Sequence, residues 1–254
     1  MSEPIMALLD DDLQALPSFE ACLDRAHGLA RALGFQVLVY DYAPVPRGLD
    51  GELITPAVFE QRAAPLDMRR LWCERGYYQR DPVQAHALRS VAPFAWSYRA
   101  PSAGGRCLYL GEAHPPLTRY LCESGLDTGL TVPLHLPGGG LATFTGIRTS
   151  GTGDALAARQ RLAGFVLLAQ VFQARAQELL PVRAGHGGPV RLTRRERECL
   201  QYSAKGLTAK SIAVAMNRSV ATVNLHLNSA ARKLGARNRV EAVVHGLHYR
   251  LIEP

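Results

Sequence analysis

The chain lacks the features that would carry it into or across a membrane. It contains no run of 18 apolar residues, which is about the length that a membrane-spanning helix needs. Acidic residues follow Met1–Pro4, where a secretory signal would have basic residues and then a long apolar stretch. We therefore expect a cytoplasmic protein with no membrane partner.

The chain also has few cysteines, and none of them has metal-binding spacing. They are Cys22, Cys73, Cys107, Cys122 and Cys199. An odd number without a CxxC pair argues against both a disulfide framework and a zinc site. Reduced thiols fit the cytoplasm, and we expect no bound metal.

Lysine is absent from residues 1–180, whose sixteen basic residues are all arginine. A phosphorylated receiver domain needs a lysine in its phosphorylation site. The acidic segment Asp10–Asp12 superficially resembles the start of such a domain, but the missing lysine excludes a response regulator of that type.

Motifs of common enzymes are missing as well. There is no GxSxG elbow, no HExxH and no glycine-rich phosphate loop. The remaining enzymatic alternative is a hydrolase of a small ligand that would use Cys73, Asp81 or His86. Dispersed Cys and His residues are expected in any chain of this size, so we predict no catalytic residue and no cofactor.

The positive charge is concentrated at the C-terminal end. Residues 181–254 contain thirteen Lys or Arg and four acids, a net charge of +9, whereas residues 1–180 have a net charge of −2. A basic segment beside a nearly neutral one indicates that the smaller part meets phosphate. Short basic helical bundles also occur in ribosome-associated domains, which is the alternative.

Three short helices are predicted in this basic segment from their caps and turns. Thr193 begins the first as the N-cap of a capping box. Gly206 ends it, and Thr208 opens the second. Asn217 is a turn residue, and Ser219 caps the third helix.

The third helix has one apolar and one polar face. Its apolar stripe is Val223, Leu227, Ala230 and Leu234. A tight turn followed by a helix with a polar outer face fits a DNA major groove. The candidate DNA-binding residues are Thr222, Asn224, Asn228, Arg232, Lys210 and Arg218. We expect the asparagines to read adenine edges and the basic residues to hold phosphate.

The first 180 residues alternate predicted helices with a few strands. Helices are expected at 10–33, 58–79, 83–90, 112–125 and 154–180. Strands are expected at 35–42 and 93–96, and as a hairpin at 129–135 and 141–147. This alternation indicates an α/β/α sandwich around an antiparallel sheet.

The composition of residues 181–190 is typical of a linker. We therefore predict an α/β domain over residues 1–180 and an all-α helix-turn-helix domain over residues 191–254.

A pattern of many residues runs through the C-terminal domain. It comprises Leu192-Thr193, Arg195-Glu196, Glu198, Leu200, Gly206, Ile212-Ala213, Ser219, Thr222-Val223, His226-Leu227, Lys233-Leu234, Asn238-Arg239 and Ala242. This pattern resembles the helix-turn-helix domain of LuxR-type transcription regulators. Leu207 and Ser211 depart from it, since the family commonly has Lys and Glu there. The resemblance implies binding to double-stranded promoter DNA.

A second pattern lies in the first domain. It comprises Asp81-Pro82, Pro93-Phe94, Trp96, Gly125-Leu126, Gly129–Pro133 and Phe144-Thr145. It resembles the signal-binding domain of the same family, which encloses an acyl-homoserine lactone between its sheet and one helical layer. The resemblance therefore covers nearly the whole chain and implies a quorum-sensing type of regulator.

The resemblance also implies roles for single residues. Asp81 would accept the amide N–H of the ligand, and Trp96 would form a wall of its site. The alternatives are that Asp81 only caps the helix that starts at Pro82, and that Trp96 is ordinary core. The other candidates are Gly129, which maintains the backbone geometry, the hydroxyls of Thr131 and Thr145, and Tyr40 of the predicted central strand.

Two positions upstream of Asp81 depart from the lactone receptors. Counting back without gaps, these receptors usually have Trp and Tyr where this chain has Met68 and Trp72. Methionine has no donor for the lactone carbonyl, and a lost bond of this kind costs about 1–3 kcal/mol.

The Met/Trp pair resembles the LuxR "solos" of plant-associated bacteria, which respond to low-molecular-weight plant compounds. We therefore expect Met68 and Trp72 to line a site for a plant-derived signal. A lactone receptor with altered preference, or a shifted register, is the alternative.

The last predicted helix carries an apolar stripe of Val240, Val243, Val244, Leu247 and Leu251. Such a stripe suits a two-fold contact between identical chains. A homodimer would set two reading helices in successive major grooves.

Overall fold

The computed structural model describes residues 13–99, 107–111, 114–148, 155–180 and 190–253. The chain divides into two compact units, which are described separately below. The first contains residues 1–46 and 52–184, and the second contains residues 47–51 and 185–254. The predicted linker lies, except for its last residue, outside the described residues. No helix within the described ranges is long and apolar enough to cross a membrane.

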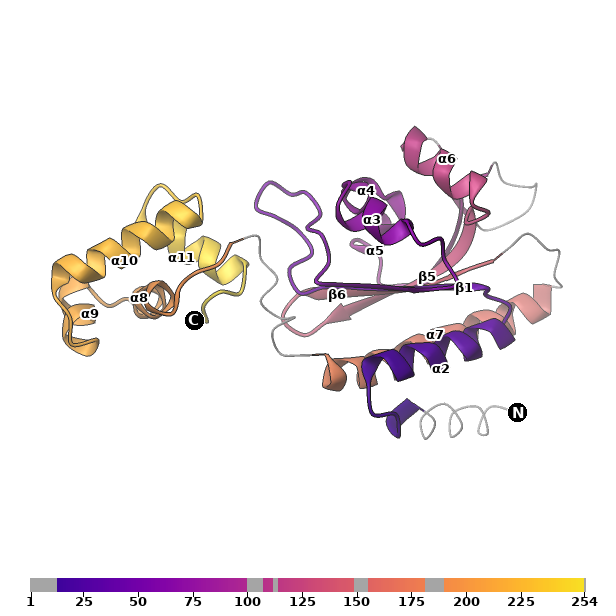
Figure 1. The fold of residues 1–254 in the computed structure, drawn as a ribbon, viewed down its shortest axis with the longest axis horizontal. Helices are drawn as coiled ribbons and strands as arrows, with labels where there is room; N and C mark the ends of the chain where they lie inside the picture. The colour runs from indigo at the N-terminus through magenta and orange to yellow at the C-terminus, as the bar shows by residue number, and fades with distance from the viewer. Residues whose placement is uncertain (1–12, 100–106, 112–113, 149–154, 181–189, 254) are drawn as a thin grey trace. The chain divides into compact units, whose positions relative to one another are not determined.

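Within the described part of the chain, the first unit is built on a six-stranded sheet (Figure 1). In spatial order its strands are β2 (Val58–Arg62), β1 (Val37–Ala43), β6 (Gly140–Ile147), β5 (Thr128–Leu136), β3 (Phe94–Ser97) and β4 (Leu108–Tyr109). Neighbouring strands are antiparallel except β3 and β4, which run parallel. The hairpin predicted from the sequence is confirmed as β5 and β6.

Helices cover both faces of this sheet (Figure 1). On one face, α2 (Phe19–Ala32) and α7 (Ala155–Leu179) pack against the alternate residues Leu38 and Tyr40 of β1. The other face carries α3 (Met68–Cys73), α4 (Tyr77–Arg80), α5 (Pro82–Ala87) and α6 (Pro115–Glu123). Successive side chains of a strand point to opposite faces, so there are two separate apolar cores. The predicted α/β/α sandwich is confirmed.

The predicted opening helix over 10–33 is not continuous. Residues 10–12 lie outside the described residues, Leu13 and Gln14 are helical, and residues 15–18 are not. In the described residues, α2 begins at Phe19 and not earlier, because the Ser18 hydroxyl accepts the Ala21 N–H at 3.2 Å and caps the helix. The chain before Ser18 includes Pro17, which has no N–H to continue a helix.

The predicted helix over 58–79 is wrong in its first part. Residues 58–62 form the edge strand β2, which pairs with β1. Gly76, in the left-handed region at φ 75°, then separates α3 from α4. Pairing with β1, the preceding strand, therefore decides the conformation of residues 58–62.

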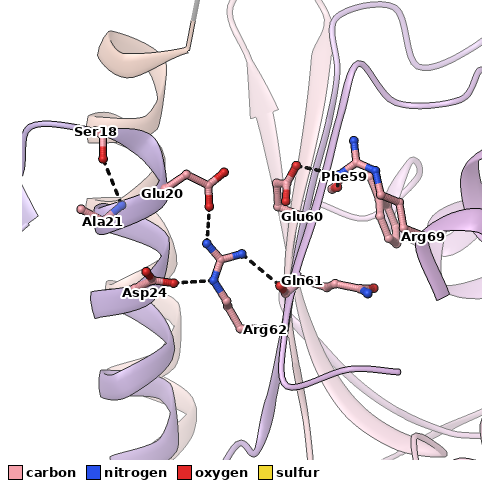
Figure 2. Close-up of polar contacts among 9 residues, drawn as sticks. All are labelled: Ser18, Glu20, Ala21, Asp24, Phe59, Glu60, Gln61, Arg62 and Arg69. Carbon is pink, nitrogen blue, oxygen red and sulfur yellow. Dashed lines mark hydrogen bonds and ion pairs between the residues drawn. The ribbon is translucent and has the colours of Figure 1, made fainter. Parts of the chain in front are cut away.

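Salt bridges join the edge strand β2 to the helix α2 (Figure 2). The Arg62 guanidinium pairs with Glu20 and with Asp24, at 2.5 Å from the Asp24 carboxylate. Arg69, at the start of α3, donates to the Phe59 carbonyl at 2.6 Å. Charged contacts of this kind on an edge strand also discourage pairing with another molecule.

The described part of the second unit is a bundle of four helices. They are α8 (Arg194–Ala204), α9 (Ala209–Ala215), α10 (Val220–Lys233) and α11 (Arg239–His248). The predicted capping box is present, with Thr193 Oγ1 accepting the Glu196 N–H and Glu196 accepting the Thr193 N–H. Gly206 and Asn217 have φ values of 80° and 50°, as their predicted turn roles require.

Candidate ligand site and DNA-binding face

A cavity lies between the sheet and the helices α3, α5 and α6. Its lining residues are Val39, Phe59, Met68, Trp72, Asp81, Val83, Gln84, Trp96, Tyr98, Leu121, Thr145 and Ile147. Its volume is about 30 Å³, room for about two water molecules, so an organic ligand requires the walls to move apart. Aromatic walls with a few polar groups are typical of sites for small organic molecules. No described cluster of three or more His, Cys, Asp or Glu side chains is placed to hold a metal ion.

Asp81 is a buried carboxylate at this cavity. Its Oδ1 accepts the backbone N–H of Val83 at 2.9 Å and the Tyr98 hydroxyl at 3.0 Å. Its Oδ2 accepts the indole N–H of Trp72 at 2.9 Å. Burial raises the pKa of Asp81, while these hydrogen bonds act in the opposite direction. Asp81 thus caps α5 and lines the cavity, so its two predicted roles are compatible.

Met68 and Trp72 lie one turn apart on α3 and are both buried. Residues at this spacing share one face of a helix, and both side chains line the cavity. The Trp72 ring packs against Tyr77 and Tyr120, with centroids 5.6 and 5.9 Å away. Its N–H is already directed to Asp81, and Met68 adds only an apolar thioether.

A chain of hydrogen bonds runs along the sheet side of the cavity. The Trp96 indole N–H donates to Thr131 Oγ1 at 2.8 Å, and this oxygen lies 2.9 Å from the Thr145 hydroxyl. If the Thr131 hydroxyl donates its hydrogen bond to Thr145 Oγ1, the Thr145 hydroxyl is free to donate to a group in the cavity. Of these three residues, Trp96 and Thr145 line the cavity, and Thr131 stands behind them.

Gly129 lies opposite Trp96 in the register of β3 and β5. A Cβ atom at this position would be 2.4 Å from Cζ2 of the Trp96 ring and 2.9 Å from the Gly146 carbonyl oxygen. Glycine therefore leaves the space that the Trp96 indole occupies. Gly129 does not itself line the cavity.

Tyr40 does not lie at the cavity, which corrects the prediction for this residue. Its ring packs against Phe19 and Phe172 in the core under α2 and α7. Its hydroxyl donates to Gln173 Oε1 at 3.0 Å. Strand residues alternate between faces, so Val39 lines the cavity and its neighbour Tyr40 points away from it.

A second buried carboxylate, Asp41, has no counterpart in the sequence-based prediction. It accepts the Tyr78 hydroxyl and Gln84 Nε2, each at 2.9 Å, and the Thr143 hydroxyl. Burial raises the pKa of Asp41 to about 7 despite these donors. Among the partners of Asp41, only Gln84 lies near a residue that the sequence predicted for the site, three positions after Asp81. Asp41 and Thr143 meet through the register of β1 and β6, which a single sequence does not reveal.

The outer face of α10 carries most of the predicted DNA-binding residues. Asn224, Asn228 and Arg232 follow one another at four-residue spacing and are exposed. Thr222 is half-buried, with its hydroxyl 2.8 Å from Ser219 Oγ. The exposed basic residues Lys210 and Arg218 lie on α9 and in the turn before α10. An exposed apolar residue that the prediction missed, Leu225, is next to Asn224.

Glu196 links α8 to α10, the helix that carries most of the predicted DNA-binding residues. It is buried and accepts Ser229 Oγ and Lys233 Nζ, both at 2.7 Å. Burial acts to raise the pKa of Glu196, but hydrogen bonds from Lys233, Thr193 and Ser229 outweigh it and lower the pKa to about 2. Ser229, on the polar side of α10, is thus a structural residue.

Comparisons with known proteins match both units. Residues 18–176 match the autoinducer binding domain, and residues 190–245 match the bacterial regulatory proteins of the luxR family. The quorum sensing-dependent transcriptional regulator RpaR of Rhodopseudomonas palustris is 34% identical, over 91% of this chain and 88% of RpaR. The transcriptional activator BjaR1 of Bradyrhizobium diazoefficiens is 26% identical, over 96% of each chain. The crystal structure of SdiA from Escherichia coli has the same fold, with a TM-score of 0.65, 20% identity and 99% coverage of both chains.

A small-molecule domain joined to a helix-turn-helix domain defines the class of ligand-binding, DNA-binding transcription regulators. Within that class, the chain belongs to the LuxR family. The family and these relatives are transcription regulators and not enzymes.

Proposed function

We propose that a small signal molecule binds the cavity of the first unit and so controls the binding of a homodimer to promoter DNA. The observation that carries this is Asp81, a buried carboxylate in a cavity walled by Trp72 and Trp96. A buried carboxylate is costly unless it is hydrogen-bonded, and a ligand N–H adds a charge-assisted bond. A ligand that binds only the folded domain stabilises it in proportion to the logarithm of its concentration.

The signal that we favour is a low-molecular-weight plant-derived compound. Met68 lines the cavity without a donor for a lactone carbonyl, and the N–H of Trp72 is engaged by Asp81. Loss of such a bond costs about 1–3 kcal/mol, which is roughly tenfold to a hundredfold in affinity. A flat, largely apolar compound with one N–H suits the aromatic walls.

An acyl-homoserine lactone is the second candidate ligand. It is favoured by the likeness to RpaR, a quorum sensing-dependent regulator that this chain matches over 88% of its length. Asp81 would accept the amide N–H of either ligand. The Thr145 proton would supply a donor to the carbonyl group that Met68 leaves without one.

A homodimer is supported by the surface of α11. Of the predicted stripe, Val240 and Val244, one turn apart, are 74% and 53% exposed, whereas Leu251 lies beyond the end of α11 and is buried. Two apolar side chains on one exposed face suit a two-fold contact, which would place two α10 helices in successive major grooves. We propose that Asn224 and Asn228 then read adenine edges. The proposed phosphate contacts are Arg232, Lys210 and Arg218.

Thermal unfolding of the full chain tests the ligand assignment. The chain has two tryptophans, Trp72 and Trp96, and both line the cavity, so their emission reports the first unit alone. We expect the midpoint to rise with fractions of plant extract more than with acyl-homoserine lactones of several chain lengths. A large rise with a lactone and none with extract reverses the assignment. Asp81→Asn is the control, because it keeps the size of the side chain but removes the charge and should reduce either rise.

DNA binding is tested separately with promoter duplexes at several salt concentrations. We expect affinity to fall steeply as salt increases, because phosphate contacts release counterions. Absence of any salt-sensitive binding, with and without the stabilising fraction, contradicts the proposed regulation.

A further inference from the structure

Gln84 presents a carbonyl oxygen to which no described group donates. The side chain is 4% exposed and lines the cavity. Its Nε2 lies 2.9 Å from Asp41 Oδ2 and 3.3 Å from Thr143 Oγ1, whereas its Oε1 has no hydrogen-bond partner. A buried polar atom left in this way costs about 1–3 kcal/mol, so a donor that enters the cavity and reaches it recovers that cost.

The orientation of the Gln84 amide follows from Asp41. Above its pKa of about 7, the Asp41 carboxylate is ionised and only accepts hydrogen bonds, so Asp41 takes the N–H end of the amide and leaves the carbonyl end directed elsewhere. The Tyr78 hydroxyl holds the other oxygen of Asp41. The described residues contain other buried atoms without partners, in Gln61, Gln79, Thr118, Gln173 and Arg175, but none of these residues lines the cavity.

We propose that Gln84 selects ligands that carry a hydroxyl group, which donates to its Oε1, in addition to the N–H that Asp81 accepts. This inference rests on the proposed function and narrows its ligand to hydroxylated amides and related compounds. Gln84 follows Asp81 by three residues on α5, which is about one turn or roughly 5 Å along the helix. The two polar groups of the ligand are therefore a few bonds apart. A hydroxyl suits the site better than an ammonium group, which would lose its hydration in a mostly apolar cavity.

Matched pairs of compounds test this on the full, unaltered chain by titration calorimetry. One pair is N-hexanoyl- and N-(3-hydroxyhexanoyl)-homoserine lactone, and the other is N-acetylphenethylamine and N-acetyl-2-hydroxy-2-phenylethylamine. In both hydroxylated compounds the hydroxyl oxygen lies three or four bonds from the amide nitrogen. We expect the hydroxylated member of at least one pair to bind about tenfold more tightly, the gain that a satisfied buried carbonyl provides. Without an acceptor, a buried hydroxyl weakens binding, so equal or weaker binding of both hydroxylated members overturns the proposal.

Two variants assign the preference to Gln84. Gln84→Met keeps the length of the side chain and removes its polar atoms, so the preference should disappear. Gln79→Met is the matched control, because Gln79 also has a carbonyl oxygen without a partner but does not line the cavity. The preference should survive in this control. A preference that also survives in Gln84→Met overturns the proposal, and if that variant does not fold, the pairs on the unaltered chain still decide.

The outcomes also separate this inference from the proposed function. Binding of all four compounds without preference overturns the role of Gln84 and leaves the ligand-binding function intact. Binding of none of them overturns the role of Gln84 as well. Only if lactones and plant fractions also fail to stabilise the first unit does the result count against the proposed function.

Discussion

Gly129 is a residue at which a single methyl group would occupy space that Trp96 already fills. An added Cβ would lie 2.4 Å from the indole ring, far inside van der Waals contact. We expect Gly129→Ala to lower the free energy of unfolding of the first unit by about 1–3 kcal/mol, because overpacking forces the ring or the strand to shift. Tryptophan emission during denaturant unfolding measures this, and the native emission should change too, since Trp96 moves.

The matched control is Gly28→Ala on α2. Nothing among the described residues lies within 4 Å of a Cβ built there, and the position is helical. Alanine should therefore stabilise the unit by about 0.5–1 kcal/mol, because glycine is the poorer helix former. If both variants have equal stability, the steric account of Gly129 is wrong.

Asp41 predicts how the stability of the first unit depends on pH. Burial raises its pKa from 3.8 to about 7 in the folded state, so the folded state binds the proton more tightly than the unfolded state. Stability should therefore fall as the pH rises from about 4 to about 7 and then level off. Asp41→Asn cannot ionise, and the fall should become shallower. Asp81, whose pKa burial also raises, contributes in the same direction and remains.

The midpoint of thermal unfolding, followed by tryptophan emission between pH 5 and pH 8, measures this slope. A variant with the same slope as the unaltered chain would show that Asp41 does not titrate in this range. The Tyr78, Gln84 and Thr143 donors would then hold it charged throughout.

The sequence predicts some of the residues at and around the cavity and misses others. Asp81 is predictable because its Asp-Pro pair marks a helix start and matches the family pattern. Met68 and Trp72 then follow from the resemblance to the lactone receptors, by counting back from Asp81. Asp41 and Thr143 are not visible, because their contact exists only once β1 and β6 are paired in one register. Tyr40 fails for a related reason, since the face of β1 that meets the cavity depends on the layers around it.

Among the elements, α8 is linked to α10 by the buried carboxylate of Glu196. Glu196 accepts Lys233 Nζ and Ser229 Oγ, and its pKa is lowered to about 2. This lowered pKa stabilises the second unit above pH 4.5, the ordinary value, and the stabilisation is lost as the pH falls toward 2. We expect Glu196→Gln to cost about 2 kcal/mol near neutral pH and less in acid.

Hydrogen exchange of α8 and α10 peptides in the full chain measures the effect, because the second unit has no tryptophan. Glu198→Gln is the matched control on the same helix. Its carboxylate pairs with the exposed Arg194 and Arg195, and such surface pairs contribute little. Equal loss of protection in the two variants would contradict the special role of Glu196.

Elements whose ends are marked by capping and turn residues are predictable from the sequence. Elements that form only by pairing with another element are not. The helices α8 to α10 follow from caps and turn residues that lie within them or next to them. Strand β2 does not, because residues 58–62 are extended only by pairing with β1 and by the reach of Arg62 to α2 (Figure 2). From the sequence they were predicted to be part of a helix.

At the scale of the whole molecule, composition is informative. The separation of net charge between the two parts of the chain predicted a smaller unit that binds DNA and a larger unit that does not, and the family comparison supports that division. The fold class followed from the alternation of helices and strands. The identity of the ligand does not follow, because it depends on a few side-chain atoms in a cavity of about 30 Å³.

The two-fold arrangement is a property of the whole molecule that the surface of α11 predicts. Val240 and Val244 present an apolar face, and a charged group placed there would have to lose its hydration in the contact. We expect the double variant Val240→Asp, Val244→Asp to sediment as a monomer under conditions in which the unaltered chain is a dimer. Its affinity for a duplex with two half-sites should drop to that for a duplex with one.

Val214→Asp is the matched control for this prediction. Val214 is a valine that is even more exposed, at 83%, but it belongs to α9 and lies outside the exposed pair Val240 and Val244. Added negative charge weakens DNA binding by itself, so the control should lose affinity for one-site and two-site duplexes in the same proportion. The double variant should instead lose the advantage of the second half-site, which only a dimer can use. If both variants keep that advantage, the dimer forms through another surface, and the α11 stripe has to be assigned to a different contact.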